Sequence, residues 1–425
     1  MNPKGSKKAE TNSDFSLDLA FHKKAGSFFI YGVFQPLQKA VKYKSFRKRL
    51  FKMKKLVKFL SAALCAALVL AAMAGCGGNE KSKAFLIGCT GPLTGDASSY
   101  GISVKQGASL AVEEINKNGG LNGVEFSFDM KDDKATAEDA NTGYDALYDA
   151  GMKISLGGVT SGSCAAFAEK AAKDNIFVMT PSASAADVIK KGDNTFRVCF
   201  GDPDQGVLAA EELSKNFKKI GCIYDTSDPY SSGIYDAFKA KMAELKTEFT
   251  TKTFDKENNK DFSTQVEALK DCDVIFVPFY YTEAGLVAKA CVQKGVKAEL
   301  FGCDGLDGIA SQIDSTVTNR IRYITPFDVA STDEKVAKFV SDYKTKYGAE
   351  PDQFAADGYD AVYAIYNAMK SAGVKDASIT AGDLCDKIVE AITASDFSYE
   401  GVTGKMTWDK SGAATKVPVI VELGK

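Results

Sequence analysis

The chain has 425 residues, which is too long for one compact core and suits two or three domains. Apolar residues make up 45% and charged residues 25%, values typical of globular proteins, so disorder along the whole chain is excluded. The formal charge of −2 is unevenly distributed, because residues 76–425 carry 38 Lys and Arg against 52 Asp and Glu. This acidic body argues against nucleic acid as the main partner.

The first recognisable signal is a leader for export. A positive segment at residues 53–58 and an apolar stretch at 60–73 predict a secretory signal peptide over residues 53–75. The apolar stretch is shorter than the roughly 20 residues that a membrane span needs. Small residues follow it and end at Cys76, which resembles a bacterial lipobox, in which the cysteine is acylated. We therefore expect a lipid anchor on Cys76 with residues 76–83 as a polar tether; an ordinary cleaved signal is the alternative.

Residues 1–52 fit no part of this leader, since a signal peptide should begin the chain. The hypothesis is that translation starts at Met53; the alternative is a genuine cytosolic extension. The only histidine of the sequence, His22, lies in this doubtful stretch. An exported protein that begins after it has no histidine, which excludes Ser-His-Asp and Cys-His catalysis and His-ligated metal sites.

The cysteines give no metal or redox motif, because no C-x-x-C pair occurs. Several lie in or beside apolar strand patterns, which favours buried small hydrophobic residues. Disulfides are the alternative, since an exported protein can form them. The eight cysteines beyond the leader and the proposed lipid site are Cys89, Cys164, Cys199, Cys222, Cys272, Cys291, Cys303 and Cys385.

From residue 84 onward, short apolar runs alternate with longer amphipathic ones. The run at residues 274–277 is apolar on both faces, as a central parallel strand must be. Repeated β-α units imply parallel sheets with helices on both faces, and the remaining length implies two lobes. Strands are expected at residues 85–88, 124–130, 154–159, 176–179, 220–224, 274–277 and ending near Phe301, and helices at 99–117, 135–150, 164–173, 233–245 and 286–293.

Hydroxyl side chains follow two neighbouring strands in the first half of the chain. Thr160 and Ser161 open a helix after one strand, and Ser182 and Ser184 follow the next. Ligands of open α/β sheets bind beyond the carboxyl ends of the strands, and helix N–H groups with hydroxyls suit an anion. Neither G-x-x-x-x-G-K-[ST] nor G-x-G-x-x-G occurs, so a carboxylate is favoured over a polyphosphate. Helix capping by serine is the alternative for each cluster.

The second half supplies aromatic and acidic residues after its own strands, namely Tyr230, Tyr280 and Asp304. A carboxylate pairs with a cation, and aromatic rings bury an apolar body. A site that offers hydroxyls to an anion, a carboxylate to an ammonium and rings to a side chain describes an amino acid. Taken singly, each tyrosine could equally belong to the core, and Asp304 could be a turn residue.

Six further motifs stand out along the chain: Ile87-Gly88, Gly91-Pro92-Leu93-Thr94-Gly95, Tyr100-Gly101, Gly107-Ala108 to Glu114-Ile115-Asn116, Thr180-Pro181-Ser182-Ala183 and Ala356-Asp357-Gly358-Tyr359-Asp360-Ala361. Together these motifs resemble those of the branched-chain amino acid binding proteins, the substrate-binding components of ABC importers. The resemblance covers residue 84 to the C-terminus and implies an α/β fold of two Rossmann-like lobes with three crossover strands, the type I periplasmic binding protein fold. It implies residues 84–202 plus 328–407 as lobe 1 and 203–327 plus 408–425 as lobe 2, with crossovers near 199–203, 323–328 and 406–410.

The resemblance also implies roles for individual residues. Ser161 is expected to give its hydroxyl and N–H to the ligand carboxylate, Ser182 its backbone groups, and Ser184 its hydroxyl. Asp304 is expected to hold the α-ammonium. The residues expected to enclose the ligand are Tyr100, Tyr230, Tyr280 and Phe354, with Val159 at the side-chain end.

The implied function is binding without bond-making: a monomer, lipid-anchored on the outer face of the bacterial cytoplasmic membrane, captures a neutral amino acid, branched-chain or similar, and delivers it to an ABC permease. No cofactor, metal or catalytic residue is expected. An amidase or deaminase is disfavoured because the sequence supplies no evident base. The remaining alternative is a sensory protein of the same fold that signals to a membrane receptor.

Overall fold

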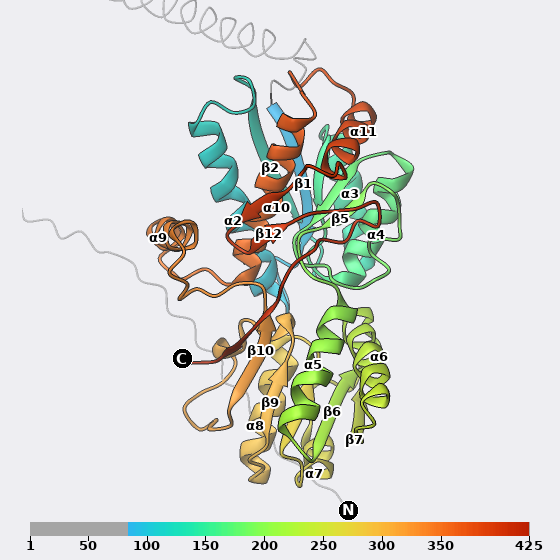
Figure 1. The fold of residues 1–425 in the computed structure, drawn as a ribbon, viewed down its shortest axis with the longest axis vertical. Helices are drawn as coiled ribbons and strands as arrows, with labels where there is room; N and C mark the ends of the chain where they lie inside the picture. The colour runs from blue at the N-terminus through green and yellow to red at the C-terminus, as the bar shows by residue number, and fades with distance from the viewer. Residues whose placement is uncertain (1–83, 425) are drawn as a thin grey trace, which may run out of the picture. The chain divides into compact units, whose positions relative to one another are not determined.

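The computed structural model describes residues 84–424 (Figure 1). The expected signal peptide, the Cys76 lipid site and the doubtful residues 1–52 lie outside this part. Two separate sheets organise the described chain, one in the order β2-β1-β3-β4-β5 and the other β13-β10-β9-β8-β6-β7. Every strand pair in them is parallel except β10 with β13. This arrangement confirms the predicted α/β class with two Rossmann-like lobes.

Lobe 1 is built on the first sheet and receives chain from both ends of the described sequence. Its strands are β1 (Ala84–Gly91), β2 (Glu125–Asp132), β3 (Ile154–Gly157), β4 (Phe177–Thr180) and β5 (Thr195–Arg197), with a hairpin of β11 (Tyr399–Gly401) and β12 (Gly404–Met406). Its helices are α2 (Ser98–Lys117), α3 (Ala137–Asp149), α4 (Ser161–Lys173), α9 (Glu334–Tyr347), α10 (Gln353–Ser371) and α11 (Ala381–Ile392).

Lobe 2 is built on the second sheet. Its strands are β6 (Ile220–Asp225), β7 (Phe249–Phe254), β8 (Val274–Val277), β9 (Glu299–Gly302), β10 (Ile321–Thr325) and β13 (Val419–Glu422). Its helices are α5 (Asp202–Asn216), α6 (Pro229–Glu244), α7 (Ser263–Ala268) and α8 (Tyr281–Lys294), with short 3-10 turns η1 (Asp304–Leu306) and η2 (Ile309–Ser311). All four residues of β8 are buried, as their two-sided apolar pattern predicts.

The expected elements are present, and the differences at their ends have local causes. Strand β3 was expected to reach Val159 but ends at Gly157, whose φ of +64° leaves the extended region. Helix α4 was expected from residue 164 but begins at Ser161, with Thr160 in extended backbone at its N-cap. This earlier start carries the helix N-terminus to the edge of the sheet where ligands bind.

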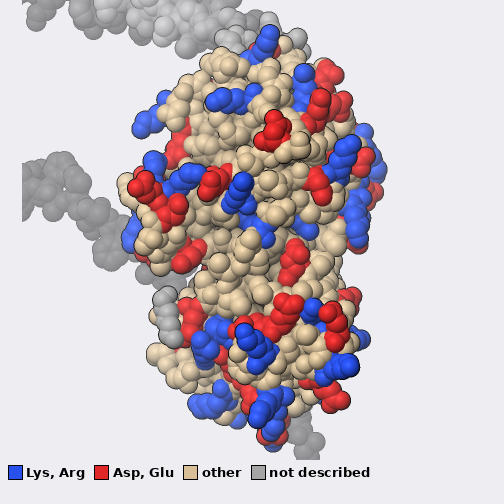
Figure 2. Space-filling view, viewed as in Figure 1, with Lys and Arg blue, Asp and Glu red and all other residues tan. Residues whose placement is uncertain are grey.

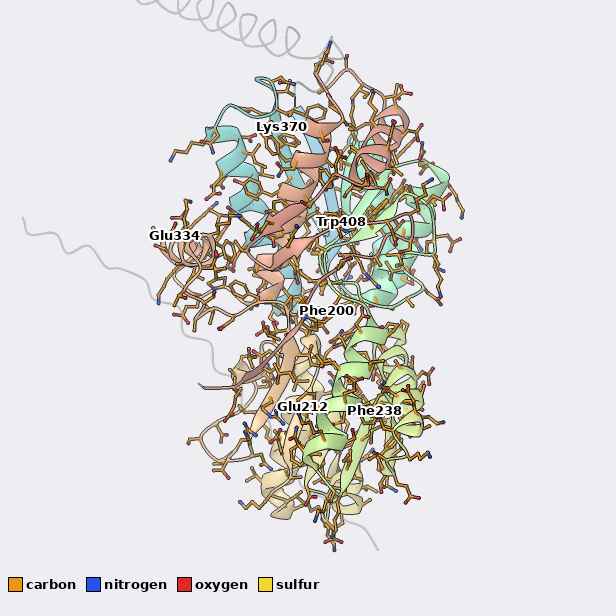
Figure 3. The ribbon with its side chains drawn as sticks, in the orientation of Figure 1. Phe200, Glu212, Phe238, Glu334, Lys370 and Trp408 are labelled. Carbon is orange, nitrogen blue, oxygen red and sulfur yellow. The ribbon has the colours of Figure 1, made fainter. Side chains whose placement is uncertain are left out.

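The chain passes between the lobes after β5, after β10 and after β12. Phe200 already belongs to the buried hydrophobic cluster of lobe 2, which also includes Phe238, and Phe327 contacts Phe339 of α9 in lobe 1. Figure 3 shows Phe200 near the junction of the lobes and Phe238 well inside lobe 2. The expected lobe boundaries after residues 202, 327 and 407 stay predictions. No helix within residues 84–424 is long and apolar enough to cross a membrane.

Charged side chains of both signs are interspersed over both lobes on the face shown in Figure 2. A nucleic-acid-binding surface would instead gather Lys and Arg into one stripe or patch. The mixed pattern of this face agrees with the acidic composition of the body.

Helix α10 reaches the junction of the lobes because glycines let it lie close against α2. A Cβ atom on Gly107 would overlap the carbonyl oxygen of Ala355, and one on Gly358 would lie 2.7 Å from the carbonyl oxygen of Val104. The two helices therefore depend on the missing side chains for their contact. This contact fixes the first turn of α10 relative to the first sheet.

Replacing Gly107 by alanine should lower the free energy of unfolding by about 1–3 kcal/mol, because the new methyl group overlaps backbone that cannot easily move. The matched control is Gly382→Ala in α11, where the nearest atom, on Asn175, is 3.5 Å away. There the better helix propensity of alanine should leave stability unchanged or raise it by up to about 1 kcal/mol. Urea unfolding measures both, and equal effects would contradict the close-contact explanation.

Candidate functional site

The loops after the strands of both lobes enclose one buried pocket. Eight of the nine residues predicted to bind the ligand line it, together with Thr160 and Gly305; the eight are Tyr100, Val159, Ser161, Ser182, Tyr230, Tyr280, Asp304 and Phe354. Ser184 is not among the lining residues. The structure thus brings together residues from distant parts of the sequence, and their roles in ligand binding stay predictions.

The wall from lobe 1 is made of hydroxyls and a helix N-terminus. Ser161 is the first residue of α4, and its Oγ accepts a hydrogen bond from the backbone N–H of Ala185 at 3.2 Å. The hydroxyl of Ser182 donates to the carbonyl of Val159 at 2.8 Å. The first N–H groups of a helix have no partner within the helix, so they can donate hydrogen bonds to an anion. This wall suits a carboxylate.

Ser184 lies behind this wall and is fully buried. Its carbonyl accepts a hydrogen bond from Nη1 of Arg197 at 2.6 Å, and its buried hydroxyl has no hydrogen-bond partner among the described residues. The structure therefore places Ser184 where it supports the loop rather than at the pocket surface. The expectation that its hydroxyl contacts the ligand stays a prediction.

The wall from lobe 2 is centred on Asp304, at the start of η1. The hydroxyl of Tyr230 donates to Oδ1 of Asp304 at 2.6 Å, and the N–H of Gly305 donates to the same oxygen at 2.9 Å. Burial raises the pKa of Asp304 to about 6, although the Tyr230 hydrogen bond opposes the shift. Since both bonds end on Oδ1, Oδ2 keeps the capacity to accept from a cationic donor.

Aromatic rings form the rest of the pocket in two stacked pairs. Tyr100 stacks on Phe354 with ring centroids 4.1 Å apart, and Tyr230 stacks on Tyr280 at 5.1 Å. The Tyr100 hydroxyl also joins the lobes, because it belongs to α2 and donates to the carbonyl of Gly305 in lobe 2 at 2.5 Å. These contacts leave a cavity of about 10 Å³, room for about one water molecule. An amino acid can therefore enter only if the walls separate.

Two glutamines that the sequence analysis missed hold Asp304 in place. The backbone N–H of Asp304 donates to Oε1 of Gln205 at 3.0 Å, and Nε2 of Gln353 donates to the carbonyl of Asp304. Gln353 is the first residue of α10 and is directly followed by Phe354, so this helix start contributes to the site twice. The position of Gln353 beside a predicted ligand residue was the available signal.

The charges of the pocket favour a ligand that carries a positive group. No Lys or Arg lines it, whereas Asp304 does, and the half-buried Asp228 lies near Tyr280. Burial raises the pKa of Asp228 to about 6 as well. A simple anion would have to bind next to these acids without a cationic side chain to compensate, so a zwitterion or a cation fits better.

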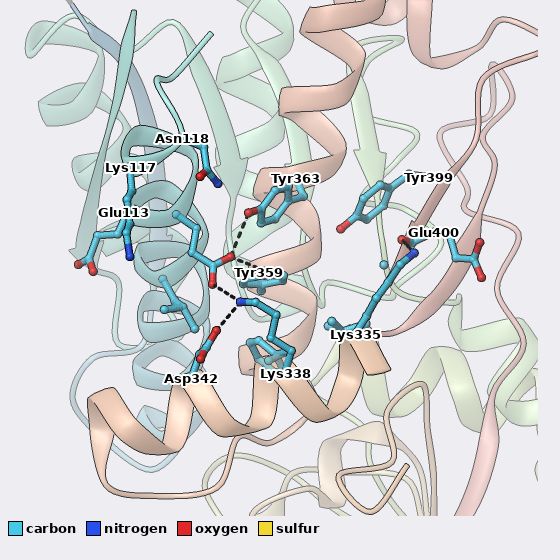
Figure 4. A pocket seen from close by; sticks show the side chains of 15 residues that line it. Glu113, Lys117, Asn118, Lys335, Lys338, Asp342, Tyr359, Tyr363, Tyr399 and Glu400 are labelled. Atoms are coloured by element: carbon cyan, nitrogen blue, oxygen red, sulfur yellow. Dashed lines mark hydrogen bonds and ion pairs between the residues drawn. The ribbon is translucent and has the colours of Figure 1, made fainter. Parts of the chain in front are cut away.

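A larger hollow of about 710 Å³ lies elsewhere, between α2, α9, α10 and β11 (Figure 4). At its centre the Glu114 carboxylate accepts hydrogen bonds from the hydroxyls of Tyr359 and Tyr363, and Lys338 bridges Glu114 to Asp342. Its central charges are thus already paired with one another. This hollow holds none of the predicted ligand residues and is not the candidate site.

Metal and thiol chemistry receive no support from the described part of the chain. Within residues 84–424 no group of three or more His, Cys, Asp or Glu could hold a metal ion. All eight cysteines of this part are free thiols, seven of them buried and Cys272 half-buried. This agrees with their prediction as small buried hydrophobic residues rather than disulfide partners.

Comparison with known proteins decides the family. The sequence model of the periplasmic binding protein family matches residues 85–421. The chain belongs to the periplasmic binding protein family. The Leu/Ile/Val-binding protein BraC3 of Rhizobium johnstonii is 30% identical over 358 residues, which cover 83% of this chain and 95% of BraC3. The Leu/Ile/Val-binding protein homolog 1 of Brucella abortus is 28% identical over 344 residues, covering 79% and 91%.

Solved structures agree with this membership. The branched-chain amino acid transporter substrate-binding protein LivJ from Streptococcus pneumoniae, crystallised with isoleucine, has a TM-score of 0.72 and 29% identity and covers 80% of this chain and 95% of its own. The leucine-binding protein LivK from Thermotoga maritima has a TM-score of 0.72 and 26% identity over similar shares, 80% and 96%. The chain is therefore an exported substrate-binding protein of the branched-chain amino acid binding family, and not an enzyme.

Replacing Asp304 by asparagine should stabilise the ligand-free protein at neutral pH. The folded-state pKa of about 6 exceeds the usual value near 4. The free energy of unfolding is therefore unaffected by this group below pH 4 and falls as the pH rises through 6. Asparagine keeps the acceptor for Tyr230 but carries no charge, so the gain should reach up to about 3 kcal/mol at pH 7.5 and vanish at pH 4. Urea unfolding at both pH values checks this. A loss of stability at pH 7.5 would contradict it.

Proposed function

We propose that this protein captures a neutral amino acid, branched-chain or similar, between its two lobes outside the cell and delivers it to an ABC permease. The observation that carries the proposal is the placement of Ser161 and Asp304 on opposite walls of one buried pocket. One wall offers N–H and hydroxyl groups, and the other offers a carboxylate. That pair matches the two charged groups at the backbone end of an amino acid.

The carboxylate of the ligand binds at the start of α4. The N–H groups of the first helical turn and the Ser161 hydroxyl donate hydrogen bonds to it, and the partial positive charge of the helix N-terminus favours the anion. The ammonium binds Asp304, whose carboxylate accepts a hydrogen bond from Tyr230 and whose backbone is held by two glutamines. Charge-assisted hydrogen bonds of this kind are stronger than neutral ones, more so when water is excluded.

The remaining walls favour an uncharged side chain. The aromatic pairs and Val159 offer apolar surface, and the lining includes no Lys or Arg that could pair with an acidic side chain. The crystallised LivJ complex with isoleucine supports an aliphatic ligand, since LivJ is similar to this chain along most of its length.

Binding requires movement, because the cavity of about 10 Å³ is too small for any amino acid. The lobes open, the ligand binds to the lobe 1 wall, and closure brings Asp304 and Tyr230 onto it. Closure shifts an equilibrium between conformations that the protein already samples. Contacts between lobes such as that of Tyr100 with Gly305 form only in the closed arrangement.

Removing the Asp304 carboxylate should weaken amino acid binding by about 2–4 kcal/mol, because a buried ammonium would be left unpaired. Asp304→Ala is compared with the wild type by isothermal titration with isoleucine, leucine and valine. The control is Asp314→Ala, which removes an exposed acid from the same lobe. The assigned role fails if Asp304→Ala binds as tightly as the control.

The ligand class is tested by a thermal-shift screen of the twenty amino acids. A ligand at 100 times its dissociation constant stabilises the folded protein by about 2.7 kcal/mol, which is readily detected. Delivery to a permease is tested by uptake of the labelled ligand in cells that lack the protein. Uptake should fall, whereas a purely sensory protein would leave it unchanged.

We further propose that the protein is anchored by a lipid on Cys76. The basis is the signal pattern over residues 53–75 with a cysteine directly after its small residues. Cys76→Ser should move the protein from the membrane fraction to the soluble exported fraction, as judged by fractionation and immunoblotting. Retention of this variant in the membrane would count against a lipid on this cysteine.

A further inference from the structure

The motif at residues 356–361 is not used by the ligand pocket, yet its acids are deeply buried. Asp357 forms an ion pair with Lys416 at 2.8 Å, and the two side chains are only 3% and 1% exposed. Asp360 accepts hydrogen bonds from the N–H groups of Val402 and Thr403, in the turn of the β11–β12 hairpin. Both acids of the motif therefore fasten the C-terminal part of the chain to α10.

Residues 408–416, called here the C-terminal strap, contact lobe 1 at their start, middle and end, through Trp408, Gly412 and Lys416. Nε1 of Trp408 donates to the carbonyl of Arg197 at 2.7 Å, and the N–H of Arg197 donates to the carbonyl of Gly412 at 3.0 Å. Arg197 is the last residue of β5, so the strap follows the edge of the first sheet. Figure 3 shows Trp408 well inside lobe 1. The strap ends at Lys416, whose side chain pairs with Asp357 of α10.

The chain changes lobe directly after the strap. Strand β13 begins at Val419 and pairs antiparallel with β10 of the second sheet. Between Lys416 and β13 stand only Val417, which is 82% exposed, and Pro418. Any relative movement of the lobes along this connection must therefore be taken up at these two residues.

The ion pair also lies close to the ligand pocket along α10. Asp357 is one helical turn after Gln353 and Phe354, which contact Asp304 and Tyr100. Fixing α10 to the strap thus fixes the helix start that forms part of the pocket. Loss of Lys416 would leave the buried acid of Asp357 without its cation.

We propose that Lys416 is a positioning residue of the binding site: its buried ion pair with Asp357 holds the C-terminal strap on lobe 1, so that the third connection bends at residues 417 and 418. The inference rests on the proposed closure around an amino acid. It assigns a role to the motif of α10 that contact with the ligand does not explain.

Spin-label distance measurements test which lobe the strap moves with. Labels are placed on exposed positions by Lys410→Cys on the strap, Asp149→Cys in lobe 1 and Glu244→Cys in lobe 2. The full chain is used with Cys65, Cys76 and Cys272 replaced by serine; the other seven thiols are buried, which protects them from labelling. Isoleucine is the probe ligand.

Adding isoleucine should leave the distance from position 410 to position 149 unchanged. The distance from position 410 to position 244 should change, because the lobes close. If both distances change, the strap does not move with lobe 1 and the inference is overturned, while closure itself stands. If neither changes although titration shows binding, closure is refuted, and the inference falls with it.

Lys416→Met tests the ion pair, with the exposed strap residue Lys410→Met as the matched control. Lys416→Met should weaken isoleucine binding at least 10-fold and broaden the distance distribution between positions 410 and 149, whereas Lys410→Met should change binding less than 2-fold. If Lys416→Met does not fold, the double variant Lys416→Met/Asp357→Leu removes the unpaired acid and is measured in its place. A folded variant with unchanged affinity and an unbroadened distribution would overturn the inference.

Discussion

The site depends on one buried carboxylate, that of Asp304. Taking an ionised carboxylate out of water is unfavourable unless a cation pairs with it, and the rise of its pKa to about 6 expresses that penalty. The surrounding residues do not relieve it with a Lys or Arg in the pocket lining. Tyr230 holds the carboxylate, and Gln205 and Gln353 hold the backbone of Asp304. In the proposed function a ligand ammonium supplies the missing charge. The buried carboxylate thus lowers the stability of the ligand-free protein at a position that the proposed binding requires.

In the proposed function both lobes recognise the ligand, because residues that follow the strands of each sheet line the same pocket. Lobe 1 contributes the helix N-terminus at Ser161 and the first turn of α10, and lobe 2 contributes Asp304 and Tyr230. Neither wall is complete alone, so the full set of contacts exists only when the lobes are closed. This explains why the closed pocket is so small and why Tyr100, which contacts both lobes, belongs to the ligand wall and to the closure contacts at once.

Ser161, Ser182, Tyr230, Tyr280 and Asp304 could be predicted from sequence because they follow the ends of strands, where parallel sheets place their ligands. Phe354, in the first turn of α10, was implied only by the family resemblance. The alternation of strands and helices gave the class of fold for the same reason. Gln205 and Gln353 could not be found in this way, because they act on Asp304 through contacts between distant segments. Ser184 follows the same strand as Ser182 but does not line the pocket, a difference of depth that a linear pattern does not contain. The strap was missed because an ion pair between residues 357 and 416 has no periodicity to reveal it.

The absence of Lys and Arg from the pocket lining has a consequence for metabolic selectivity. A 2-oxo acid with the same side chain as a branched-chain amino acid has the same shape and the same carboxylate, but it carries a carbonyl where the amino acid carries its ammonium. In this pocket that carbonyl oxygen would face the Asp304 carboxylate, and two acceptors would oppose each other in a space without water. The protein would thereby separate nitrogen-bearing nutrients from their deaminated counterparts by one electrostatic contact rather than by size.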